Sequence, residues 1–174
     1  MTAWGRSTFG ELNLPPGLSN VVAIAAGWYH ALGVRSDGSV LAWGNNFGGQ
    51  ATVPNSASNV VAVAAGREHS LALTRDGKVL AWGGNESGQV TVPAGLAEVS
   101  ALAAGEGHSA ALLSNGTVVV WGQGTFGQTN PPAGLANVTQ ISSGTYHLLA
   151  LKSDGTVVAG GLEHQGQLAA QITS

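Results

Sequence analysis

One feature constrains the fold of this chain more than any other, and that is a period of 39 residues. The Trp-Gly pairs at Trp4, Trp43, Trp82 and Trp121 stand 39 residues apart, without a single insertion or deletion between them. Three further markers keep the same interval: His30, His69, His108 and His147; Gly27, Gly66, Gly105 and Gly144; and the turn pairs that begin at Asp37, Asp76, Asn115 and Asp154. A chain with this pattern is expected to fold as stacked copies of one supersecondary unit.

Each unit has the alternation and the turn residues of short β-strands, and helical periodicity is absent. A small apolar run is followed by a glycine and an alternating segment, and an Asp-Gly or Asn-Gly pair then supplies the positive φ angles of a tight hairpin. Proline is expected to end the last strand because it cannot donate to a ladder. In the first complete unit the expected strands are residues 21–26, 30–35, 39–43 and 51–53, and Pro54 follows.

A unit of this length with four strands is the size of a β-propeller blade. We therefore predict a single all-β repeat domain over residues 1–174, built as a β-propeller of four-stranded antiparallel blades. The blades are expected at residues 21–59, 60–98, 99–137 and 138–174, and residues 1–20 form a spare half blade that supplies a third and a fourth strand. The last unit departs from the pattern, with Gly160 in place of tryptophan and Ala169-Ala170-Gln171 in place of Thr-Val-Pro.

Composition excludes several classes of function. The chain has 6 Lys and Arg residues, scattered singly, and a net charge of -3, so no basic stripe is available for nucleic acid. It has no cysteine, which excludes disulfides, thiolate catalysis and Cys-ligated zinc. No apolar run is long enough to cross a membrane, and Met1 to Phe9 lacks the pattern of a secretory signal. The compartment is left open.

The sequence motifs of the repeats point to a known family. The segment VVAVAAGREHSLALTRDGKVLAWGGNESGQVTVP, from Val60 to Pro93, resembles the regulator of chromosome condensation type of β-propeller repeat in its shorter bacterial form. These motifs are most similar to those of the secreted propeller-type β-lactamase inhibitory proteins. The resemblance implies a seven-bladed ring that binds proteins through loops on one face, and one eukaryotic branch also promotes nucleotide exchange on a small GTPase.

Four complete units are too few for the ring that the resemblance implies. Open sheet edges and open blade faces invite pairing, so we expect two chains to join as a homodimer that completes one ring. A monomeric four-bladed ring and a fragment of a longer protein are the alternatives.

Comparison of the units separates framework positions from variable ones. Two residues change between each glycine and histidine marker, and a second stretch changes between each Trp-Gly and Gly-Gln marker. In an up-and-down meander the connection between the first and second strands and the connection between the third and fourth strands emerge on the same side. We therefore expect one face to bind a protein partner through aromatic and charged side chains. The residues expected there are Trp28, Tyr29, Phe47, Arg67, Glu68, Glu86, Glu106, Phe126 and Tyr146.

Three other interpretations of these loops stay open. They can be ordinary solvated loops whose aromatics cover the rim of the core. They can bind carbohydrate, with Trp28, Tyr29 and Tyr146 stacking on sugar rings beside the polar side chains of Asn45, Asn46 and Asn85. Finally, the regular period is also typical of an architectural or engineered repeat scaffold without a ligand.

The sequence favours neither catalysis nor a cofactor. Four histidines at one position of the repeat are better explained by a repeated hydrogen bond at the head of the second strand than by a shared metal ion, so no metal site is expected. Glu68 and Glu106 are expected to face one another across the mouth of the ring, but nothing gives them the contrasting environments of a catalytic acid and base. The Gly122-Gln123-Gly124 segment lies between strands and has no helix N-terminus to receive a phosphate. We therefore predict a non-enzymatic binding module.

Overall fold

The computed structural model describes residues 2–161, which form twelve β-strands in four separate three-stranded antiparallel sheets. Each sheet is one repeat of the sequence, and we number these units first to fourth. The strands are β1 (Val21–Ala26), β2 (His30–Arg35) and β3 (Val40–Gly44); β4 (Val60–Ala65), β5 (His69–Thr74) and β6 (Val79–Gly83); β7 (Val99–Ala104), β8 (His108–Leu113) and β9 (Val118–Gly122); and β10 (Val138–Ser143), β11 (His147–Lys152) and β12 (Val157–Gly161).

The four sheets share one register because they share the same turn chemistry. The first strand of each unit begins with a β-bulge, as between Val21 and Ala23, and the residue before it has a positive φ angle. The second and third strands meet in the predicted hairpin, where the Asp37 carboxylate accepts a hydrogen bond from the Ser39 amide at 2.9 Å. The same bond joins Asn115 to Thr117 and Asp154 to Thr156. The predicted hairpins are therefore confirmed.

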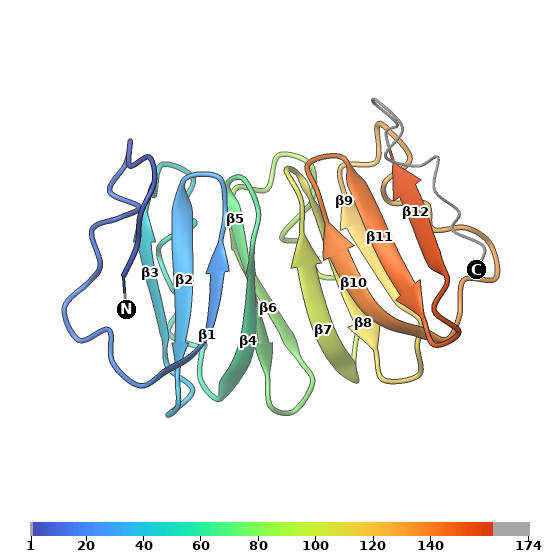
Figure 1. Cartoon of the computed structure of the whole chain (residues 1–174), viewed down its shortest axis with the longest axis horizontal. Helices are drawn as coiled ribbons and strands as arrows, with labels where there is room; N and C mark the ends of the chain where they lie inside the picture. Colours follow the sequence, from blue (N-terminus) through green and yellow to red (C-terminus); the bar gives the residue numbers. More distant parts are fainter. Residues whose placement is uncertain (1, 162–174) are drawn as a thin grey trace.

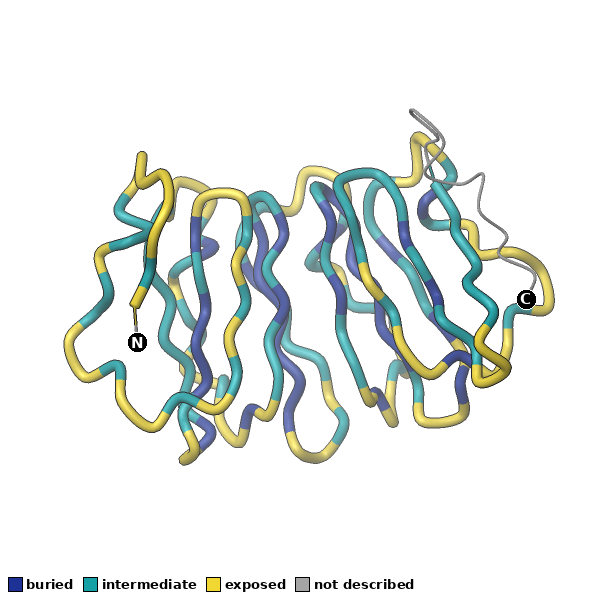
Figure 2. Tube along the Cα trace, viewed as in Figure 1, coloured by how far each residue is buried: buried dark blue, intermediate teal, exposed yellow. Residues whose placement is uncertain are grey.

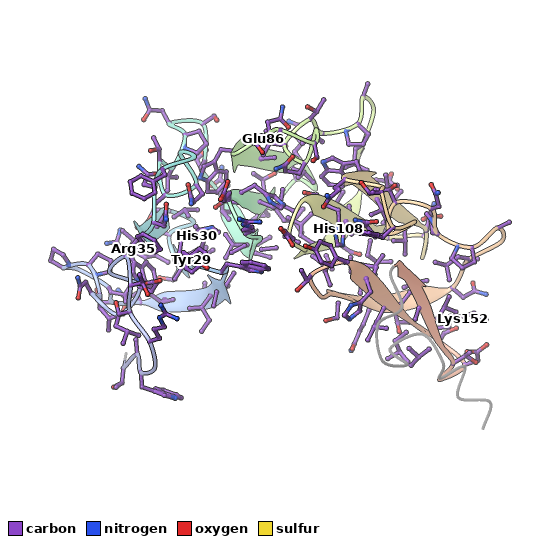
Figure 3. The ribbon with its side chains drawn as sticks, turned by 90° about the horizontal axis from the view of Figure 1, so that it is seen from above. Tyr29, His30, Arg35, Glu86, His108 and Lys152 are labelled. Carbon is purple, nitrogen blue, oxygen red and sulfur yellow. The ribbon has the colours of Figure 1, made fainter. Side chains whose placement is uncertain are left out.

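The sheets stand side by side in a row with their strand axes nearly aligned from sheet to sheet, and the first and fourth units lie at opposite ends (Figure 1). Viewed from above, the row bends into an arc, and the described residues do not close a ring (Figure 3). The all-β repeat architecture is confirmed. Within residues 2–161 there is no helix that is long and apolar enough to cross a membrane.

The core consists of layers between neighbouring sheets rather than one central cluster. Between the first and second units, Leu32, Val34, Val60, Ala72 and Trp82 form a buried layer, and equivalent layers follow along the row. Buried residues are concentrated in the middle of the row, while the first strand of the first unit alternates between half-buried and exposed residues (Figure 2). Each unit therefore depends on its neighbours for burial, as expected of a stacked repeat.

The predicted fourth strand is wrong for the first three units, because residues 51–53, 90–92 and 129–131 form no strand. The segment is used to join units instead. The Gln50 carbonyl accepts one hydrogen bond from the Trp82 indole at 2.9 Å and another from the Ser70 hydroxyl at 2.8 Å, both in the next unit. The Gln89 carbonyl repeats both bonds with Trp121 and Ser109. The corresponding part of the last unit, with Ala169 to Gln171, lies outside the described residues.

The two extra strands predicted for the N-terminus are also wrong, since residues 2–20 contain no strand. They nevertheless keep the phase of the repeat. The Glu11 carbonyl accepts the Trp43 indole hydrogen bond at 2.8 Å, which is the role of Gln50 one period later. Trp4, in phase with Trp43, is 85% exposed because no unit of the described chain precedes it.

The histidine markers connect units, which the sequence did not reveal. The expected hydrogen bond is repeated, but its partner lies on the next sheet: His30 Nε2 lies 2.9 Å from Ser70 Oγ, and His69 Nε2 lies 3.0 Å from Ser109 Oγ. The glycine marker makes room for the ring. An added Cβ at Gly66 would collide with the His69 ring and with the carbonyl oxygen of Gly105.

The last unit replaces this arrangement with three coordinated changes. Leu148 occupies the position of Ser70 and Ser109, and Ser143 occupies that of Ala65 and Ala104. His108 therefore bonds to Ser143 Oγ at 2.7 Å. Gly160 occupies the tryptophan position, and Leu148, which is 5% exposed, adds apolar bulk to the same layer. The substitution of Gly160 is therefore accompanied by a compensating one on the adjacent strand.

Candidate functional site

In the first three units both variable segments lie on one edge of the row, the upper edge in Figure 1, and the first variable segment of the fourth unit lies on the same edge. The second segment of the fourth unit, residues 162–165, lies outside the described residues. The first strand of each sheet ends, the second begins and the third ends at this edge. Backbone hydrogen bonds join the two segments directly, with Asn45 N to Tyr29 O at 2.7 Å and Gly84 N to Glu68 O at 2.7 Å. We call this surface, made of residues 27–29 and 45–50 with their equivalents among the described residues of the later units, the loop edge.

Buried glutamines give the longer loops their shape. The Gln50 side chain is 1% exposed and accepts a hydrogen bond from the Gly48 amide at 2.9 Å. Gln89 and Gln128 make the same bond to residues 87 and 126. Because the amide is fixed inside, the residues at the loop tips are held outward, and Phe47 is 89% exposed.

An aromatic cluster occupies the loop edge of the first unit. Phe9 packs edge-on against Tyr29, with ring centroids 5.2 Å apart, and against Phe47 at 5.9 Å. Trp28 packs against Tyr29 at 6.3 Å. All four side chains are exposed, so the aromatic cluster of Phe9, Trp28, Tyr29 and Phe47 presents apolar surface to solvent next to the tip of the first sheet.

A charged group extends this cluster across the second and third units. The Arg67 guanidinium lies over the Trp28 ring at 5.1 Å and forms an ion pair with Glu106. A second carboxylate, that of Glu68, lies 3.6 Å from Arg67 Nε. Hydrogen bonding to Glu106 raises the pKa of Arg67 above its usual value. Glu68 and Glu106, which were expected to face one another across the mouth of a ring, are thus brought together by Arg67.

Beside this ion pair lies a polar hollow of about 470 Å³, lined in part by Glu68, Glu86, Gln89 and Gln123. Glu86 stands at the rim of the loop edge in Figure 3. With one arginine against three carboxylates, the hollow carries net negative charge. It is therefore suited to cationic groups.

A second aromatic pair spans the loop edges of the third and fourth units, where Phe126 and Tyr146 have ring centroids 5.0 Å apart. Hydrogen bonding to Glu106 raises the pKa of Tyr146, so the charged group extends to this pair. The nine residues predicted from the sequence thus lie along one continuous loop edge that runs over all four units.

Phe9 was not among the site residues predicted from the sequence, although the 39-residue period identifies it. Phe9 and Tyr29 stand in the same phase as Phe126 and Tyr146, three periods later. The two pairs make the same edge-on contact, at 5.2 and 5.0 Å. The segment before the first sheet therefore contributes to the loop edge.

The asparagines that the carbohydrate interpretation requires are used by the loops themselves. The Asn45 side-chain oxygen accepts hydrogen bonds from the Phe47 amide and from Gln50 Nε2. Asn46 and Asn85 each bond a threonine hydroxyl and a backbone amide within their own loop. Amides committed in this way are poorly placed to read a sugar hydroxyl.

The loop edge offers no metal-ligand set among the described residues, since no three His, Asp or Glu side chains lie close enough together to hold one ion. The Nε2 atoms of His30, His69 and His108 are taken by serine, and burial lowers the pKa of each of these histidines to about 4. They are neutral parts of the framework.

A family model, the regulator of chromosome condensation (RCC1) repeat, matches residues 21–50, 60–89, 99–128 and 138–167. The chain belongs to the RCC1 repeat family. Each match begins at the first strand of a unit and, in the first three units, ends at the buried glutamine that shapes the loop. Members with this repeat are generally non-catalytic binding domains.

Solved structures agree with the RCC1 fold. Prp20p from Saccharomyces cerevisiae superposes with a TM-score of 0.77 at 24% identity, covering 95% of this chain and 54% of that one. Human WBSCR16 gives 0.73 at 23% identity over 88% and 51%, and the ectodomain of the Physcomitrella patens receptor kinase CR4 gives 0.75 at 22% over 91% and 46%. The chain therefore spans about half the length of these relatives. The search of curated proteins gives no match.

Proposed function

We propose that this RCC1 repeat chain is a non-catalytic module that binds a protein partner through the loop edge. The observation that carries the proposal is the aromatic cluster of Phe9, Trp28, Tyr29 and Phe47, which is exposed on a rigid framework. Exposed aromatic side chains on adjacent loops are typical of interface hot spots, and on a surface without a partner they promote aggregation.

Charge supports the same interpretation. The cluster borders the polar hollow that contains Glu68, Glu86 and Glu106, so a partner would combine an apolar anchor with a cationic group. Relatives with solved structures bind proteins: one report describes the binding properties of Prp20p to Gsp1p and histones, and one structure shows Kap60 bound to yeast RCC1. Those partners belong to those proteins, and only the mode of function is proposed for this chain.

The direct test is affinity capture with a triple variant, Trp28→Ala, Tyr29→Ala and Phe47→Ala. We expect the variant to lose at least nine-tenths of the captured partner while its circular dichroism and unfolding midpoint stay close to those of the parent chain. The matched control changes Ser36, Arg75 and Ser153 to alanine, three exposed residues in equivalent positions on the opposite edge. Equal capture by the parent, the triple variant and the control would refute binding through the loop edge.

The resemblance to β-lactamase inhibitory proteins adds one defined partner to this test. The variable loops rather than the framework would determine such binding, because a fold alone does not fix a function. Purified β-lactamase should therefore be measured against the parent chain and the triple variant by calorimetry. A glycan array completes the set, and sugar binding without protein capture would favour the carbohydrate interpretation instead.

We further propose that the four units form one domain over residues 1–174 and that two copies associate as a homodimer. The support is the number of units and their coverage of relatives, which is 54% of Prp20p and 51% of WBSCR16. Light scattering at two concentrations tests the association, and a monomer mass at both would refute it. Whether two copies close one ring, as expected from the sequence, depends on the faces at the two ends of the row.

A further inference from the structure

The first unit exposes a sheet face whose equivalent, in each later unit, is covered by the unit before it. Ile24 and Ala26 point away from the second unit, and Ile24 is 64% exposed. The equivalent residues of the second unit, Val63 and Ala65, pack in the layer formed with Ala23 and Ala25 of the unit before it. The free face of the first unit is therefore built like an internal one, and we call it the N-terminal face.

The N-terminal face contains both a projection and a hollow. Trp4 is 85% exposed and stands at the margin of a hollow of about 380 Å³. The hollow is largely apolar, and its walls include Leu12, Ile24 and Leu32 with the rings of Trp28 and Trp43. A large aromatic side chain thus lies beside a space of sufficient volume to receive one.

The opposite end of the row is different. Internal units present alanine pairs to the next sheet, namely Ala62 with Ala64 and Ala101 with Ala103. The last unit has Gln140 and Ser142 in these positions, and both are exposed. A polar outer face is the character of a capping repeat, which ends a stack and keeps it in solution.

These two faces do not complement each other. If two copies closed one ring head to tail, Gln140 and Ser142 of one copy would lie against Ile24 and Ala26 of the other, in the layer where internal units place alanine. An amide and a hydroxyl would then be buried opposite apolar side chains that offer no hydrogen bond, which is unfavourable.

Resting on the proposed homodimer, we propose that two copies pair through their N-terminal faces about a two-fold axis. Such an interface uses the same patch on both copies, so projection and hollow must lie on one face. Trp4 and the hollow satisfy this condition, with Trp4 of each copy entering the hollow of the other. Apart from Trp28, which also lines the hollow, the loop edges of both copies remain free, and the dimer presents two of them to partners.

The chain has no cysteine, so single cysteines report the arrangement directly. In the two-fold dimer, Ile24→Cys alone and Thr2→Cys alone should each give a covalent dimer with a short bis-maleimide, at a yield at least tenfold above that of Ser142→Cys alone. A head-to-tail ring predicts the reverse: crosslinking only when Ile24→Cys and Ser142→Cys chains are mixed. That result would overturn the two-fold arrangement while leaving the homodimer in place, whereas a monomer mass would overturn both.

A second pair of variants tests the same interface through the dimer dissociation constant. Trp4→Ala combined with Ile24→Glu should raise the dimer dissociation constant at least tenfold, because it removes the projection and charges the face. Gln140→Ala combined with Ser142→Ala is the matched control and should leave the dissociation constant unchanged. A tighter dimer in the control variant would indicate that the C-terminal face is part of the joint. If the variant with Trp4→Ala and Ile24→Glu still captures the partner, the dimer interface and the loop edge are separate surfaces.

Discussion

At the residue scale, the repeated histidine acts as a neutral connector between sheets. The Ser70 hydroxyl donates its hydrogen to the Gln50 carbonyl, so it must accept a hydrogen from His30 Nε2. The remaining ring nitrogen, Nδ1, is then buried without a partner, and the same holds for His69 and His108. Burial lowers the pKa of all three rings to about 4, because a charged imidazole would be desolvated there.

This state predicts a loss of stability in weak acid. Each histidine has a pKa of about 4 in the folded chain and an ordinary value of 6.5, so the unfolded chain binds more protons between these values. The free energy of unfolding should therefore fall as the pH drops from about 6.5 to about 4, by roughly 1.4 kcal/mol per pH unit for each ring. Urea unfolding at several pH values measures the slope. His69→Gln keeps a donor for Ser109 and should reduce the slope by about one third; an unchanged slope would contradict the assignment.

Backbone conformation supplies a second prediction at this scale. Asn20, Asn59 and Asn137 precede the first strands with φ between 54° and 59°, and Glu98 holds the same place with φ 56°. Asparagine adopts this left-handed region at a lower free-energy cost than glutamate. Glu98→Asn should raise the free energy of unfolding by about 1 kcal/mol, and Asn59→Glu should lower it by a similar amount. Urea unfolding of both variants checks this, and equal stability of both with the parent chain would argue against it.

At the element scale, the units are joined by the segment that follows each third strand. Its carbonyl at Gln50 or Gln89 receives an indole and a hydroxyl of the next sheet, and these bonds take the place of a fourth ladder strand. The last unit replaces both donors, with Gly160 for the tryptophan and Leu148 for the serine. The two positions should therefore be energetically coupled.

A double-mutant cycle tests this coupling. Gly160→Trp alone should destabilise the chain by about 1–3 kcal/mol, because Leu148 stands where the second and third units have serine and narrows the hollow that the indole would enter. Adding Leu148→Ser restores the pattern of the second and third units and should recover most of that loss. Thermal unfolding of the two single variants and the double variant gives the interaction energy. Additive effects would show that the two substitutions in the last unit are independent.

At the scale of the whole molecule, the period predicted the architecture well but not the connections. Markers at Trp43, Gly66 and His69 were enough to place the units and to put both variable loops on one edge, since that follows from a meander. The role of residues 51–53 was mistaken because Thr-Val has strand propensity, while the hydrogen bonds from the next sheet go to the Gln50 carbonyl just before this segment. The serine partners of histidine were invisible because they lie 40 residues away in the sequence.

The separation of framework from loop edge also explains why the nine predicted site residues form one surface. Framework residues join sheet to sheet, as Trp82 and His69 do, and are buried. Loop residues such as Phe47 and Glu86 make no framework bond and face solvent. Recognition can therefore vary without disturbing the stack, which is a common property of repeat scaffolds.

Hydrogen–deuterium exchange of the chain, alone and with its captured partner, tests most directly that the loop edge is where the molecule meets that partner. Binding through the loop edge predicts slower exchange in residues 27–29, 45–50, 67–68, 84–88, 106–107, 123–127 and 145–146. Unchanged exchange is expected in the opposite turns at residues 36–39, 75–78, 114–117 and 153–156. Protection of those turns, with the loop edge unaffected, would contradict it.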